Sequence, residues 1–153
     1  QKIETMLLEW KTKRFETLSS LELYELLKLR SEVFVVEQNC VYQDIDGKDE
    51  KAIHILGKFE DKIVVYARIF NAGAYFENAS IGRVVISEKY RTQKWGHELM
   101  KKAISSIESE IGVQPITISA QLYLKKFYEN HGFVQLGEMY LEDGIPHIEM
   151  LRQ

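Results

Sequence analysis

A strand, a short loop and a helix start follow one another between residues 81 and 100, and together they could hold an anionic group. Ile81–Ile86 is apolar and typical of a strand, and a helix opens near Gly96. The N-terminus of a helix offers free backbone N–H groups and the positive end of the helix dipole, which suit phosphates. Arg91 and Lys94 add positive charge there. This pattern predicts a phosphate site, although an ordinary strand–loop–helix with solvated cations fits the same residues.

The segment Phe127–Phe133 could supply a proton. Leu124, Phe127 and Tyr128 share one face of a short helix at spacings of three and four residues. A tyrosine beside a departing group can donate its phenolic proton as a general acid. The alternative is that Tyr128 is simply a core or rim side chain.

Three side chains could accept a proton near neutral pH. Glu37 is the first candidate, acting directly or through water. His54 and His147 are alternatives, because imidazole titrates near neutrality. Glu37 could instead cap or pair at a helix end, and His54 could be a core histidine.

Several other sites can be excluded. The sequence has no dinucleotide-binding or P-loop glycine motif and no serine nucleophile elbow. His97-Glu98 lacks the second histidine of a zinc protease, because residue 101 is lysine. Asp44–Gly47 imitates a calcium loop, but its first and last ligand positions are Tyr42 and Ile53. Cys40 is the only cysteine, so neither an internal disulfide nor a multi-cysteine metal site is expected, and we expect no metal.

Strands and helices alternate along the chain in a way that predicts an α/β fold. A capping box at Ser19 and Glu22 starts a helix, and Gly82 suggests a bulge in its strand. The early strands should be antiparallel, and the later ones parallel where two helices cross over. The expected strands are Met6–Trp10, Ile53–Phe59, Lys62–Phe70, Ala79–Ile86, Pro115–Ala120, Phe133–Leu136, Tyr140–Leu141 and His147–Leu151. The expected helices are Ser20–Val36, a segment from Gln93 to Gly112, and Leu122–Asn130.

Length and composition favour one domain over residues 1–153. Hydrophobic residues make up 45% of the chain, so disorder is not expected. The net charge is −3 without a long basic stretch, which argues against nucleic acid as a partner. The sequence has no run of 18 apolar residues, so no membrane span is expected, and no signal-peptide pattern is present. With a single cysteine, a reducing, cytoplasmic location is expected.

Two of these segments resemble motifs of the GNAT N-acetyltransferases. Arg91-x-x-Lys94-x-Gly96 after an apolar strand resembles the pyrophosphate loop of that superfamily, and Gln121–Phe133 resembles its second motif. Three longer strings are similar to the ElaA-like bacterial branch. They are Leu29–Gln38, Tyr42–Asp46 and Glu142–Ile148.

The resemblance implies a GNAT fold, with a mixed central sheet flanked by helices and two parallel strands splayed at a bulge. It implies acetyl-CoA as cosubstrate, with an amine of a small molecule or peptide as acceptor and direct attack without an acyl-enzyme. Tyr128 would protonate the coenzyme thiolate, and the amide N–H of Val85 would polarise the thioester carbonyl. The implied cofactor-binding residues are Val84, Val85, Ile86, Arg91, Thr92, Gln93, Lys94, Trp95, Gly96, His97, Gln121 and Tyr128.

Two positions depart from the family pattern. Lys94 replaces a glycine of the loop, so we expect the loop either to turn differently or to bring the lysine to a phosphate. Gln121 is one methylene longer than the usual asparagine. Two other functions stay open: an acyl-homoserine-lactone-synthase-like acyltransferase, and a GNAT module that binds CoA without turnover. Either a monomer or a homodimer is compatible with the sequence.

The acidic residues around position 46 could rim a site for a cationic amine. Asp44, Asp46, Asp49 and Glu50 lie within seven positions. An acidic loop is more often simply solvated.

Overall fold

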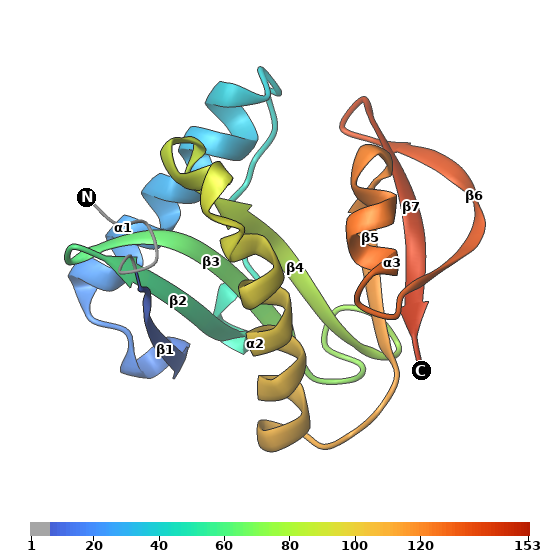
Figure 1. The fold of residues 1–153 in the computed structure, drawn as a ribbon, viewed down its shortest axis with the longest axis horizontal. Coiled ribbons are helices and arrows are strands. Elements are labelled where there is room, and N and C mark those ends of the chain that lie inside the picture. Colours follow the sequence, from blue (N-terminus) through green and yellow to red (C-terminus); the bar gives the residue numbers. More distant parts are fainter. Residues whose placement is uncertain (1–6) are drawn as a thin grey trace.

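The computed structural model describes residues 7–153, which form a seven-stranded mixed sheet with the order β1-β2-β3-β4-β5-β7-β6. Helices α1 and α2 pack on β3 and β4 through two separate apolar clusters, and α3 packs beside β5 (Figure 1). The strands are β1 (Glu9–Arg14), β2 (Ile53–Phe59), β3 (Lys62–Phe70), β4 (Ala79–Ile86), β5 (Ile116–Gln121), β6 (Val134–Glu142) and β7 (Ile145–Arg152). The helices are α1 (Ser20–Arg30), α2 (Trp95–Glu110) and α3 (Lys125–Glu129).

The two halves of the sheet part between β4 and β5. These strands are parallel, as α2 crosses over between them, but they pair only at Ala79 with Ile116 and at Ser80 with Thr117. Beyond these two pairs the strands diverge, and Figure 1 shows the β1–β4 half turning away from the β5–β7–β6 half. The predicted GNAT fold, with two splayed parallel strands, is therefore confirmed.

The bulge lies in β4, one residue after Gly82. Tyr66 pairs with Val85 and Arg68 pairs with Gly82, so β4 carries one more residue than β3 between these pairs. Arg83 takes a φ of 50°, a left-handed conformation that is uncommon for a residue with a Cβ. The extra residue changes which positions face α2, from Ala79 and Ile81 before the bulge to Val84 and Ile86 after it.

The first helix begins where the sequence predicted it. Ser19 Oγ accepts from the Glu22 N–H at 3.0 Å, and Glu22 accepts from the Ser19 N–H at 2.9 Å, which is the predicted capping box. Regular α-helix ends at Arg30, however, and Ser31–Glu37 continues as a π-helix. The predicted single helix Ser20–Val36 is thus two segments, and the wider π turns are often found at functional sites.

Several other predicted boundaries were wrong. The first strand runs from Glu9 to Arg14 rather than from Met6 to Trp10, and Met6 lies outside the described residues. The two short strands predicted at 133–136 and 140–141 are one strand, β6, interrupted by a bulge at Gly137 (φ 71°). The second crossover does not create a parallel pair, because β7 lies between β5 and β6 and is antiparallel to both.

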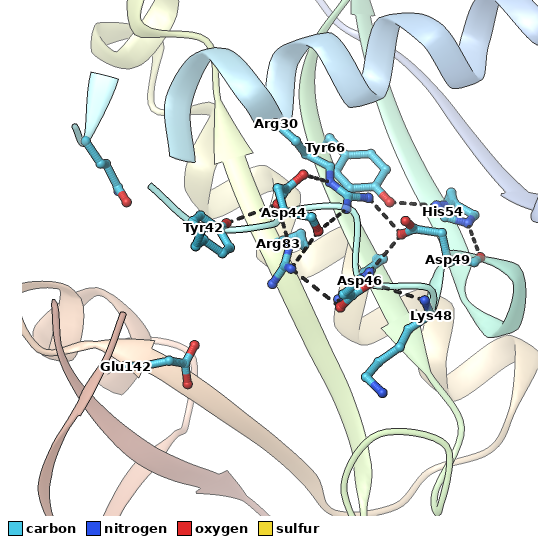
Figure 2. A network of polar contacts seen from close by, with 12 residues as sticks. Arg30, Tyr42, Asp44, Asp46, Lys48, Asp49, His54, Tyr66, Arg83 and Glu142 are labelled. Atoms are coloured by element: carbon cyan, nitrogen blue, oxygen red, sulfur yellow. Dashed lines mark hydrogen bonds and ion pairs between the residues drawn. The ribbon is translucent and has the colours of Figure 1, made fainter. Parts of the chain in front are cut away.

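A buried network of arginines and aspartates fixes the acidic loop to the core. Asp44 accepts from Arg30 Nε at 2.9 Å, and Asp49 accepts from Arg30 Nη1 at 2.7 Å and from Arg68 Nη1 at 2.8 Å (Figure 2). Asp46 accepts from Arg68 Nη2 at 2.6 Å. Arg30 and Arg68 are at most 1% exposed. Asp44 and Asp49 are therefore not solvated, contrary to the simpler expectation for an acidic loop. Asp46 is half-buried and paired with Arg68, and it lines the large cleft between β4 and β5.

We expect Asp49→Asn to lower the free energy of unfolding by about 3–5 kcal/mol, because it removes one partner from two buried guanidinium groups. Denaturant unfolding monitored by fluorescence measures this loss. Glu50→Gln is the matched control; Glu50 is the exposed neighbour, and its change should stay within about 0.5 kcal/mol. A loss below about 1 kcal/mol for Asp49→Asn would contradict the role of the network.

Asp46 should make stability depend on acid pH. Burial opposes its ionisation, but the hydrogen bond and charge of Arg68 prevail and hold the pKa of Asp46 at about 2. A depressed folded-state pKa stabilises the fold above the unfolded value, about 3.9, and this stabilisation is lost as the pH falls toward 2. The difference in unfolding free energy between the native chain and Asp46→Asn should therefore shrink from pH 5 to pH 2.5. A constant difference would contradict this expectation.

Candidate functional site

An open cleft of about 870 Å³ lies where β4 and β5 part. One wall is β4 from Ile81 to Ile86, and a second is the C-terminal part of the π-helical segment with Gln38. The opposite wall comes from β5, α3 and the β6–β7 turn, where Glu142 faces the buried network across the opening (Figure 2). The splay of the two strands thus brings together side chains from most of the chain.

The edge of β4 that faces the cleft is available for pairing. The Ser87 N–H donates to the Val64 carbonyl at 2.8 Å, so residue 87 is directed toward β3. Backbone direction alternates along a strand, so the Val85 N–H also faces β3, whereas Val84 and Ile86 face the cleft. Consistently, the Ile86 carbonyl accepts from Arg91 on that side. The Val85 N–H is therefore not positioned to polarise a carbonyl in the cleft, and Val84 is the better-placed donor.

The loop between β4 and α2 does not turn differently because of its lysine, contrary to one of the two expectations for Lys94. Lys94 adopts φ 61° and ψ 23°, the left-handed conformation that a glycine would take most easily. It is followed at once by the first turn of α2, whose leading N–H groups have no partner within the helix. At Gly96 a Cβ would meet Ile86 Cδ1 at 3.2 Å and Phe127 Cε1 at 3.3 Å. Glycine therefore lets the helix start lie close to β4 and α3.

The predicted cofactor residues divide into two groups. Val84, Val85, Ile86, Arg91, Gly96, Gln121 and Tyr128 line the cleft. Thr92, Gln93, Lys94, Trp95 and His97 are not among its lining residues. Trp95 is 4% exposed and packs with Phe59 and Tyr90, and the His97 ring lies beside Phe127 and His131. The side chains of Trp95 and His97 are thus directed into packing contacts, whereas those of Thr92 and Lys94 are exposed.

Arg91 is already engaged at the mouth of the cleft. Its guanidinium donates to both carboxylate oxygens of Glu37, with the Nη2–Oε1 distance at 2.6 Å. The hydrogen bond from Arg91 holds the pKa of Glu37 below its ordinary value, against a smaller opposing effect of burial. While this pair persists, Glu37 is a weaker base than a free carboxylate.

Tyr128 lies in the wall of the cleft and is 6% exposed. Burial raises its pKa, so the phenol stays protonated at neutral pH and has a proton to donate. Its ring packs edge-on against Phe127 and Phe133, which fixes its orientation. The geometry therefore suits a proton donor directed at the space between β4 and β5.

Two of the three candidate bases face the cleft. His54 is fully buried, with its ring nitrogens at 2.6 Å from the Tyr66 hydroxyl and 2.9 Å from the Asp49 carbonyl, and it does not line the cleft. His54 is therefore a core histidine, as the alternative interpretation from the sequence predicted. His147 and Glu37 do line the cleft. His147 Nδ1 lies 2.7 Å from the Ile145 carbonyl and therefore donates to it, and Nε2 lies 3.8 Å from Glu142 Oε2.

Several lining residues were not anticipated from the sequence. Gln38 joins Gln121 across the cleft through two amide hydrogen bonds, of 3.3 and 3.5 Å. Arg83 lines the cleft from the bulge, with its Nε 2.8 Å from Asp44 Oδ1. The alternation of apolar residues along β4 shifts by one position at Arg83, and this shift in the sequence could have indicated the bulge that places Arg83 in the cleft. Gln38 carried none, because its partner is 83 residues away.

Membrane-spanning helices and metal-binding clusters of side chains are both absent from residues 7–153. None of their helices is long and apolar enough to cross a membrane. Nor does this part of the chain gather three or more histidine, cysteine, aspartate or glutamate side chains in an arrangement that could hold a metal ion.

Comparison with known proteins identifies the family. A family model described as an acetyltransferase (GNAT) domain matches residues 17–153. Protein ElaA of Escherichia coli (strain K12) is 45% identical over 149 residues, which are 96% of this chain and 97% of ElaA. Its crystal structure has a TM-score of 0.90 at 44% identity, over 96% of this chain and 100% of that one. An acyl-CoA N-acyltransferase from Pseudomonas aeruginosa has a TM-score of 0.91 at 41% identity, over 95% and 99%. The chain therefore belongs to the GNAT acetyltransferases, in their ElaA-like branch.

Proposed function

We propose that this chain is an N-acetyltransferase, which moves an acetyl group from acetyl-CoA to an amine of a small molecule or peptide. The observation that carries the proposal is the cleft itself. A free β-strand edge, the N-terminus of a 16-residue helix and a buried tyrosine meet there. The relative from Pseudomonas aeruginosa, titled an acyl-CoA N-acyltransferase, supports an acyl-CoA as the donor. A cytoplasmic location is part of the proposal and agrees with the buried, unpaired Cys40.

The residues present fit the donor in three places. The edge of β4 at Val84 and Ile86 can pair with the amides of the pantetheine arm, as an added strand would. The backbone from Arg91 to His97 at the start of α2 can receive the diphosphate. Gln121 lies beside this path from the β5 side, hydrogen-bonded to Gln38.

The reaction requires two proton movements around one acyl transfer. The neutral amine attacks the thioester carbonyl, and the Val84 N–H at the cleft-facing edge of β4 polarises that carbonyl. The carbon–sulfur bond then breaks, and Tyr128 gives its proton to the departing thiolate. Glu37 takes the proton of the amine, directly or through water, and His147 is the second candidate for this step.

Release of free thiol from acetyl-CoA tests this function. A panel of polyamines, amino acids, aminoglycosides and lysine peptides covers the main classes of amine. Turnover with acyl carrier protein but not with acetyl-CoA would favour an acyl-homoserine-lactone-synthase-like enzyme instead. CoA binding by calorimetry without turnover of any amine would favour a binding module.

Tyr128→Phe should lower kcat about 10- to 100-fold and leave the dissociation constant for CoA within about twofold, because only the donated proton is lost. Initial rates of thiol release and calorimetry measure the two quantities. Tyr123→Phe is the matched control, since Tyr123 also lines the cleft but is 76% exposed. Its kcat should not change. Equal rates for the native chain and Tyr128→Phe would remove Tyr128 from the mechanism.

A further inference from the structure

Glu37 and Arg91 form a bidentate ion pair across the mouth of the cleft. Glu37 is the last residue of the π-helical segment, and Arg91 comes from the loop between β4 and α2. Nη1 and Nη2 of Arg91 donate to the two carboxylate oxygens. Both side chains line the cleft and stay partly exposed, Arg91 at 41% and Glu37 at 29%.

A second contact of Arg91 decides which of its donors remain free. Nε and Nη2 also donate to the Ile86 carbonyl, at 3.2 and 3.1 Å. A guanidinium binds an anion bidentately through a pair of parallel N–H groups, and it has only a few such pairs, here called edges. The Nε–Nη2 edge faces Ile86, and the Nη1–Nη2 edge faces Glu37. A phosphate that uses this arginine as a fork must therefore displace one of the two partners.

Glu37 is the partner that can be exchanged. The Ile86 carbonyl is part of β4, so its position is fixed by the sheet. The ion pair with Glu37 is partly exposed, and exposed pairs contribute little net free energy. A phosphate oxygen would replace a carboxylate oxygen on the same two N–H groups, which exchanges one anion for another.

We propose that Glu37 competes with the diphosphate of CoA for Arg91 and thereby sets the affinity of the site for its acyl donor. This inference rests on the proposed function, because the competing ligand is the cosubstrate. Glu37 is then more than a candidate base, because it occupies the N–H groups of Arg91 until a phosphate replaces it.

The exchange would also change Glu37 itself. Arg91 is the group that depresses the pKa of Glu37. Once the phosphates occupy Arg91, that influence is shared with them, and the pKa of Glu37 rises toward its ordinary value. The carboxylate becomes a better proton acceptor only when the acyl donor is in the cleft. Binding of the donor and removal of the amine proton are thus coupled through one arginine.

Calorimetric titration with CoA tests the competition without any acceptor. Glu37→Gln keeps the shape of the side chain and removes its charge, so CoA should bind about two- to fivefold more tightly. Glu32→Gln is the matched control, since Glu32 is an exposed carboxylate of the same helical segment that is not a hydrogen-bond partner of Arg91. Its affinity for CoA should equal that of the native chain. Unchanged or weaker binding by Glu37→Gln would overturn the proposal.

A double-mutant cycle separates the specific contact from a general effect of charge. Arg91→Ala alone should weaken CoA binding, and adding Glu37→Gln to it should then bring no gain. Pantetheine, which lacks phosphates, should bind both Glu37 forms equally in competition experiments. A gain that persists without Arg91, or that appears with pantetheine, would overturn the competition. If the native chain bound no CoA, the proposed function would fail with it, whereas normal binding with no effect of Glu37 would refute the competition alone.

Discussion

The site depends on the early end of pairing between β4 and β5. After two residue pairs, the parallel strands separate, and the backbone of β4 beyond the bulge keeps one edge without a strand partner. An unpaired edge in the middle of a sheet is costly unless something satisfies its N–H and C=O groups. In this fold Arg91 satisfies the Ile86 carbonyl, and an extended ligand could satisfy its neighbours. The same break in pairing creates the cleft and supplies its principal recognition element.

Strain at the bulge is balanced by charge. Arg83 adopts a left-handed conformation that disfavours side chains with a Cβ, yet its guanidinium lies against Asp44 and above the Tyr42 ring. Asp44 is in turn bound to Arg30, which is fully buried in α1. Three arginines and three aspartates compensate one another, so the network carries no net charge into the core. It joins the first helix, the loop around residue 46 and the bulged strand into one rigid wall of the cleft.

Local patterns predicted most of the elements but not the partners of their polar residues. The hairpin of β2 and β3, the start of α1 and the bulge near Gly82 are each encoded within one short stretch of the chain, so periodicity and capping signals reveal them. Asp49 looked like part of a solvated acidic loop, because its partner Arg68 lies 19 positions later in the middle of an apolar strand. The charged residue Arg68 inside such a strand was itself a signal, because a buried guanidinium needs a carboxylate partner. His54 is likewise a polar residue inside an apolar strand, and its ring is hydrogen-bonded to the Tyr66 hydroxyl.

The candidate site shows why residue types alone left the base open. Glu37 was the first candidate from its residue type and position, with His54 and His147 as alternatives, and the fold distinguishes them. His54 is enclosed by the network, His147 is held by its own turn at the cleft, and Glu37 is bound to Arg91 at the mouth of the cleft. A base that is paired before the donor binds and released afterwards would accept a proton only in the complete complex. There the deprotonated amine can attack the thioester. That order follows from the number of donor edges on one guanidinium, a property that no single residue of the sequence expresses.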